Sequence, residues 1–211
     1  MRASLTALLP LILLAACSQA PVQPVAAPAA APVPAHPLVK IETNYGDITV
    51  QLDGTRAPLT VAEFLQHAEA HKYDNTSFYR IVPGFVIQAG DYTADYKSLP
   101  DEKPIPNESG NGLSNIRGSI GLARDADPHT GSYVFYINLA DNRKLDPRPD
   151  RWGYAVFGQV VDGLDVMDKI AAVATQDLPK TQDHDEFTNA PVTPVTIEKV
   201  VVLPPDAPEK P

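Results

Sequence analysis

Phe-Tyr-Arg-Ile-Val-Pro-Gly-Phe-Val-Ile-Gln-Ala-Gly-Asp, residues 78–91, is the stretch that decides the fold of this 211-residue chain. Apolar residues alternate on both sides of the Pro83-Gly84 pair, a pattern that predicts two strands joined by a tight turn. Such a hairpin brings Arg80 and Gln88 near an apolar floor that includes Phe85. A fixed cation beside an apolar slot suits a ligand that is itself apolar and carries one polarisable amide.

The same stretch resembles the signature of the cyclophilins, the peptidyl-prolyl cis/trans isomerases. That signature is approximately F-H-R-x-[IV]-x-x-F-x-[IV]-Q-x-G-D, and here Tyr79 stands where histidine is common. Three further blocks resemble the family in the same order and spacing, within residues 107–124, 135–146 and 153–163. The resemblance runs from about Val39 to about Leu203 and is closest to bacterial members of the periplasmic type.

Periodicity and resemblance together give an expected fold. Alternating apolar residues predict eight strands, at residues 38–43, 48–52, 78–82, 85–90, 118–123, 134–138, 155–160 and 195–202. Helical spacing predicts helices over 60–71, opened by a capping box at Thr60-Val61-Ala62-Glu63, and over 164–173. These patterns alone favour a β-rich barrel or sandwich. The resemblance implies a mainly β fold, a closed eight-stranded antiparallel β-barrel capped by two α-helices.

The chemistry implied by the resemblance is rotation about a prolyl amide bond, whose barrier is about 18–20 kcal/mol. Rotation needs neither a nucleophile nor a metal, so we expect no cofactor and no metal ligands. The resemblance assigns Arg80 the role of a donor that stabilises the twisted amide, with Gln88 as its catalytic neighbour. It places the substrate against Phe85, Val86, Ala123, Arg124, Val134, Tyr136, Leu145 and Tyr154.

Three departures from the family pattern fall near this expected groove. Val134 stands at the position of a glutamine, Tyr136 adds a hydroxyl to an aromatic position, and Lys144 replaces a rim aromatic. In the family that rim aromatic helps to bind the cyclic peptide cyclosporin. The residues alone leave open that Arg80 is ion-paired on the outer face of a strand. They also leave open a proline-binding chaperone or adaptor with little turnover, and a purely structural lipoprotein.

The beginning of the chain has the pattern of a lipoprotein signal. An apolar run ends at Leu14-Ala15-Ala16-Cys17, which resembles a bacterial lipobox, and this predicts a signal peptide at 1–16 and lipid on Cys17. Ser18, rather than aspartate, favours the outer membrane. Residues 17–37 are rich in Ala and Pro and predict an extended tether of about 3.1 Å per residue. The isomerase domain is expected at 38–203 and a disordered tail at 204–211.

Composition limits the partners. The formal net charge is −9, and an acidic chain without a basic stripe is a poor nucleic-acid binder. Cys17 is the single cysteine, so no intrachain disulfide can form. The acidic run at 183–186 lacks metal-ligand spacing and predicts a solvated loop.

We expect a monomer, anchored by lipid to the envelope and facing the periplasm, that acts on proline-containing segments of envelope proteins.

Overall fold

The structure, a computed structural model, describes residues 33–181 and 186–204. The predicted signal peptide, the cysteine expected to carry lipid and most of the predicted tether lie outside the described residues. The acidic run at 183–186 lies outside them as well, apart from Glu186. Within the described ranges, no helix is both long enough and apolar enough to cross a membrane.

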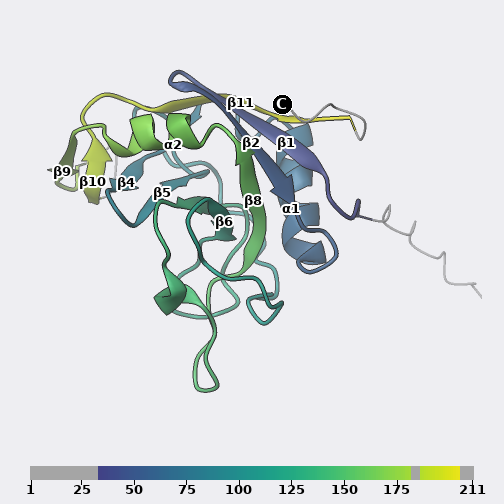
Figure 1. Ribbon diagram of the computed structural model, residues 1–211. Helices are drawn as coiled ribbons and strands as arrows, with labels where there is room; N and C mark the ends of the chain where they lie inside the picture. The colour runs from purple at the N-terminus through teal and green to yellow at the C-terminus, as the bar shows by residue number, and fades with distance from the viewer. Residues whose placement is uncertain (1–32, 182–185, 205–211) are drawn as a thin grey trace, which may run out of the picture. The chain divides into compact units, whose positions relative to one another are not determined.

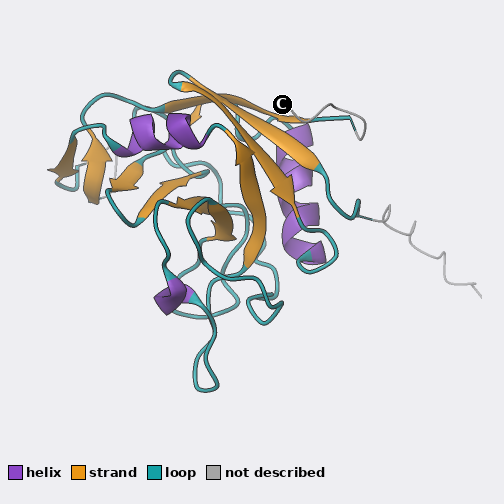
Figure 2. Cartoon of the chain, viewed as in Figure 1, coloured by secondary structure: helices purple, strands orange, loops and turns teal. Residues whose placement is uncertain are grey.

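A curled antiparallel sheet of nine strands forms the body of the fold (Figures 1 and 2). Its strands are β1 (Leu38–Thr43), β2 (Gly46–Leu52), β3 (Thr76–Ser77), β4 (Arg80–Val82), β5 (Val86–Ala89), β6 (Ser119–Leu122), β7 (Phe135–Asn138), β8 (Val156–Asp162) and β11 (Thr196–Val202). They lie in the order β3-β11-β1-β2-β8-β6-β7-β5-β4. Two further strands, β9 (Thr175–Leu178) and β10 (Phe187–Pro191), pair only with each other among the described residues.

All eight predicted strands are present, but the prediction of a closed eight-stranded barrel is wrong. The sheet has nine strands, and no ladder joins its end strands β3 and β4 within the described ranges. Between these strands the chain leaves the sheet at Phe78, whose N–H donates to the Val195 carbonyl at 2.9 Å. Tyr79 then packs into an aromatic cluster with Phe187 of β10. Because these side chains cover the edge of β4, the sheet stays open there.

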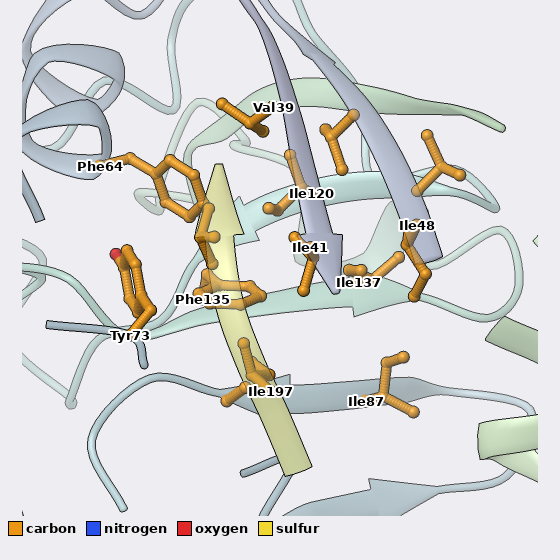
Figure 3. Packing of buried hydrophobic residues seen from close by; sticks show 14 of the residues in the cluster. Val39, Ile41, Ile48, Phe64, Tyr73, Ile87, Ile120, Phe135, Ile137 and Ile197 are labelled. Atoms are coloured by element: carbon orange, nitrogen blue, oxygen red, sulfur yellow. The ribbon is translucent and has the colours of Figure 1, made fainter. Parts of the chain in front are cut away.

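Two helices contribute to the same apolar core as the sheet. They are α1 (Pro58–Glu69) and α2 (Leu164–Ala171), and Figure 1 shows them well apart on the curled sheet. The Phe64 ring of α1 lies 5.0 Å from the Tyr73 ring and 5.5 Å from the Phe135 ring of β7 (Figure 3). Met167 of α2 is fully buried. Apolar burial of this kind contributes about 25 cal/mol for each Å² removed from water.

The start of α1 differs from the predicted capping box. The helix begins at Pro58, and no side chain of its N-cap residue Ala57 closes it. Instead, the Glu108 carboxylate accepts from the N–H of Leu59 at 3.1 Å and from the N–H of Thr60 at 2.8 Å. A carboxylate beside the helix N-terminus also interacts favourably with the helix dipole. This cap comes from 48 residues away along the chain, so local sequence could not reveal it.

The segment just before β1 is held against the domain. The carbonyl of Pro37 accepts from the Leu52 N–H at 2.8 Å, and the carbonyl of Ala35 accepts from the Gly54 N–H at 2.8 Å. A Cβ on Gly54 would lie only 2.2 Å from the Pro34 carbonyl oxygen, so the close approach depends on glycine. Residues 33–37 therefore pack on the domain.

Candidate active site

The predicted hairpin forms, and it pairs Arg80 directly with Gln88. β4 and β5 are antiparallel with Arg80 opposite Gln88, and Arg80 Nη1 donates to Gln88 Oε1 at 3.2 Å. Between the strands, the Phe85 N–H donates to the Val82 carbonyl at 2.9 Å, and Gly84 has φ = 71°. Proline followed by a residue at positive φ is the type II turn, which explains the Pro-Gly pair.

Nine of the ten predicted site residues line one cavity of about 200 Å³. They are Arg80, Phe85, Val86, Gln88, Ala123, Arg124, Tyr136, Leu145 and Tyr154. The tenth, Val134, lies instead on an adjoining cleft of about 620 Å³, which shares Arg80, Gln88, Ala123 and Arg124 with the cavity. The structure therefore brings together residues that are up to 74 positions apart in the sequence.

Tyr136 is buried beneath this cavity rather than pointing its hydroxyl into it. On β7 it lies opposite Gln88 of β5 and Gly121 of β6. Its hydroxyl donates to Asn115 Oδ1 at 2.6 Å, and burial raises the pKa of Tyr136 well above its usual value. A Cβ on Gly121 would lie 2.4 Å from the Tyr136 hydroxyl oxygen, so a glycine is required beneath the ring.

A buried network of asparagine side chains holds the loops around the cavity, and sequence reasoning missed it. Asn142 Nδ2 donates to the Phe85 carbonyl and to Asn138 Oδ1, both at 2.8 Å. Asn138 Nδ2 donates in turn to Asn115 Oδ1 at 3.2 Å, and the Asn115 N–H donates to Asp146 Oδ1 at 2.7 Å. Buried polar groups must be paired, so this network fixes the loops after β5 and β7 relative to each other. Asn115 lies in one block, and Asn138 and Asn142 lie in the next, and these positions carry no sequence pattern that would have predicted the network.

The two other cationic side chains near the cavity, Arg124 and Lys144, contact aromatic rings and backbone carbonyls, whereas Arg80 binds Gln88. Arg124 stacks on the Tyr154 ring, with its guanidinium carbon 4.4 Å from the ring centroid. Its guanidinium also donates to backbone carbonyls, including those of Gly153 at 3.2 Å and Asp125 at 2.7 Å. Lys144 lies on a 3₁₀ turn, η1 (Arg143–Leu145), with its ammonium 4.6 Å from the Phe85 ring centroid. Among the described residues, only Gln88 accepts a hydrogen bond from the Arg80 guanidinium.

Comparison with known proteins agrees with this geometry. Residues 38–202 match the family described as "Cyclophilin type peptidyl-prolyl cis-trans isomerase/CLD". The chain belongs to this cyclophilin family. It is a peptidyl-prolyl cis-trans isomerase. No three His, Cys, Asp or Glu side chains come together as a metal site within 33–181 and 186–204.

This cyclophilin is similar in sequence to two bacterial relatives and similar in fold to one solved structure. The chain is 42% identical over 152 residues to peptidyl-prolyl cis-trans isomerase B of Escherichia coli, covering 68% of this chain and 93% of that protein. It is 36% identical over 165 residues to peptidyl-prolyl cis-trans isomerase A of Dickeya dadantii, covering 78% of this chain and 84% of that protein. The crystal structure of a cyclophilin-type isomerase from Cryptosporidium parvum has the same fold, with a TM-score of 0.64 at 23% identity. The match covers 80% of this chain and 98% of that one.

Because the Lys144 ammonium lies over the Phe85 ring, we expect residue 144 to affect the affinity for cyclosporin. A macrocycle that covers Phe85 must displace a strongly hydrated ammonium, whereas a tryptophan at position 144 would add a flat apolar face. In Lys144→Trp, the inhibition constant for cyclosporin should fall about tenfold, which is about 1.4 kcal/mol. Turnover of a short proline peptide should change little, because such a peptide would lie deeper, on Phe85 and Leu145.

Lys144→Ala is the matched control for this prediction, since it uncovers the Phe85 ring without adding an aromatic surface. It should lie between the wild type and Lys144→Trp in a titration of isomerase activity with cyclosporin. Identical inhibition constants for all three proteins would show that residue 144 does not contact the drug.

Proposed function

We propose that this cyclophilin speeds X-Pro isomerisation by donating hydrogen bonds from Arg80 to the twisted prolyl amide. We further propose that its substrates are proline-containing segments of envelope proteins. The observation that carries the first proposal is the position of one guanidinium, held by Gln88, at the wall of a cavity of about 200 Å³ that Phe85, Val86 and Leu145 also line. A guanidinium is always charged and presents several donors in a fixed plane, so it suits an acceptor that appears only during rotation.

The proposed mechanism divides the substrate into a held half and a rotating half. Phe85, Val86 and Leu145 provide apolar surface for the proline ring. Twisting removes resonance, so the prolyl nitrogen gains a lone pair that accepts from Arg80 more strongly than the planar amide does. Preference for the twisted state over the planar state is what lowers the barrier.

The substrate residue before proline would lie along the backbone of Ala123 and Arg124. The Ala123 N–H already donates to the Val134 carbonyl at 2.8 Å. Substrate backbone there would therefore pair through the Ala123 carbonyl rather than through its N–H. Arg124 is the less suitable donor to the reacting amide, because its guanidinium is committed to backbone carbonyls.

The first test of this mechanism is Arg80→Ala in an assay of proline-peptide isomerisation. Loss of one donor that acts on the transition state typically costs about 10²–10³ in rate, and we expect a fall of that size in kcat/KM. Lys199→Ala removes an exposed cation from β11, outside the cavity, and should leave kcat/KM unchanged. Near-full turnover by a folded Arg80→Ala protein would contradict the mechanism.

A second candidate function is a proline-binding adaptor with little turnover. The specific observation that favours it is Val134, which stands where the family has a glutamine and lines the adjoining cleft, so the site lacks one polar contact to the substrate. The same assay separates the two functions. A wild-type protein that binds proline peptides but does not accelerate their isomerisation would establish the adaptor.

The envelope location is proposed from the lipobox-like sequence that ends at Cys17. Mass spectrometry of the full-length protein, expressed in a Gram-negative host and extracted from membranes, should show a mature start at Cys17 with acyl mass added. Cys17→Ser should remain unprocessed or lose the lipid. A cleaved but unmodified cysteine would mean that the protein is not anchored by lipid.

A further inference from the structure

The side chain of Tyr79, next to Arg80 in the chain, is fixed from both ends. Its ring is 94% buried and packs edge-to-face against Tyr92, with centroids 4.8 Å apart, and against Phe187 of β10, with centroids 5.9 Å apart. Its hydroxyl accepts a hydrogen bond from Gln88 Nε2. The β9–β10 pair therefore holds the ring of a residue whose hydroxyl contacts the partner of Arg80.

The donor and acceptor roles in this group are settled by chemistry. A guanidinium can only donate, so Gln88 must present its carbonyl oxygen to Arg80. The amide nitrogen of Gln88 then faces Tyr79 and donates to the hydroxyl oxygen. The three side chains form one directed series that starts at the Arg80 guanidinium and ends on the Tyr79 hydroxyl.

We propose that Tyr79 is a positioning residue, which holds the amide nitrogen of Gln88 while the carbonyl oxygen of the same side chain binds Arg80. This inference rests on the proposed role of Arg80. If the amide rotated by 180°, its NH₂ group would face the guanidinium, and two donors would meet without an acceptor. Arg80 would then lose its partner at the cavity wall, and the donor would no longer be held toward the reacting amide.

Burial raises the pKa of Tyr79 well above its usual value, and the nearby charge of Asp91 raises it further. The Tyr79 hydroxyl therefore keeps its proton, and its oxygen accepts from Gln88 Nε2.

The decisive variant is Tyr79→Phe, which keeps the buried ring and removes only the hydroxyl. We expect kcat to fall about tenfold, the size of effect that one lost hydrogen bond can produce, with KM changed less than about twofold. Tyr96→Phe is the matched control in the same aromatic cluster. Its hydroxyl donates to the Pro191 carbonyl at 3.4 Å, and its loss should leave both constants unchanged.

A double-mutant cycle with Gln88→Ala separates positioning from general stabilisation. If Tyr79 acts through Gln88, adding Tyr79→Phe to Gln88→Ala should lower kcat by less than about twofold, although alone it costs about tenfold. An undiminished tenfold loss in that background would overturn the proposal. Circular dichroism and thermal melts of each protein show that the comparison is between folded states.

If Arg80→Ala retained activity, the proposed function would fail, whatever the Tyr79 variants gave.

Discussion

The hydrogen bond between Arg80 and Gln88, across the β4–β5 hairpin, is the interaction on which the rest of the site depends. An arginine at the wall of an open cavity has many rotamers, and most of them would turn its charge to water. A cross-strand partner removes that freedom, because residues directly opposite each other have Cβ atoms only about 5 Å apart. The turn at Pro83-Gly84 sets this register, so the shape of one turn decides where the cation lies.

The remainder of the fold supports this hairpin from three sides. β7 pairs with β5 and carries Tyr136 beneath the cavity, where Gly121 leaves room for the ring. The asparagine network binds the Phe85 carbonyl and so fixes the loop that carries the cavity's aromatic floor. On the outer edge of β4, Tyr79 and Phe187 supply packing in place of a further strand. The open edge of the sheet and the active site are thus parts of one arrangement.

The sequence was informative wherever the signal was local. Period-two alternation located the eight strands, and the Pro83-Gly84 turn predicted a hairpin that brings Arg80 and Gln88 near one apolar floor; the structure adds that the two residues pair directly. What it could not predict depends on contacts between distant segments. The Glu108 cap of α1, the asparagine network and the cover that β10 gives to β4 each join residues that are far apart in the chain. The predicted barrel closure was wrong for the same reason. Whether the two short edge strands pair with each other depends on the side chains packed around them and not on their own sequence pattern.

The most direct measurement of the central claim is solution NMR of the protein saturated with a short Ala-Pro-containing peptide. Exchange between the cis and trans peptide signals reports catalysis, and intermolecular NOEs report where the proline ring lies. We expect exchange on the protein together with NOEs from the proline ring to Phe85 and Leu145, and a shift of the Arg80 guanidinium resonances on binding. Catalysed exchange with the ring's NOEs confined to residues outside this cavity would contradict the proposed mechanism.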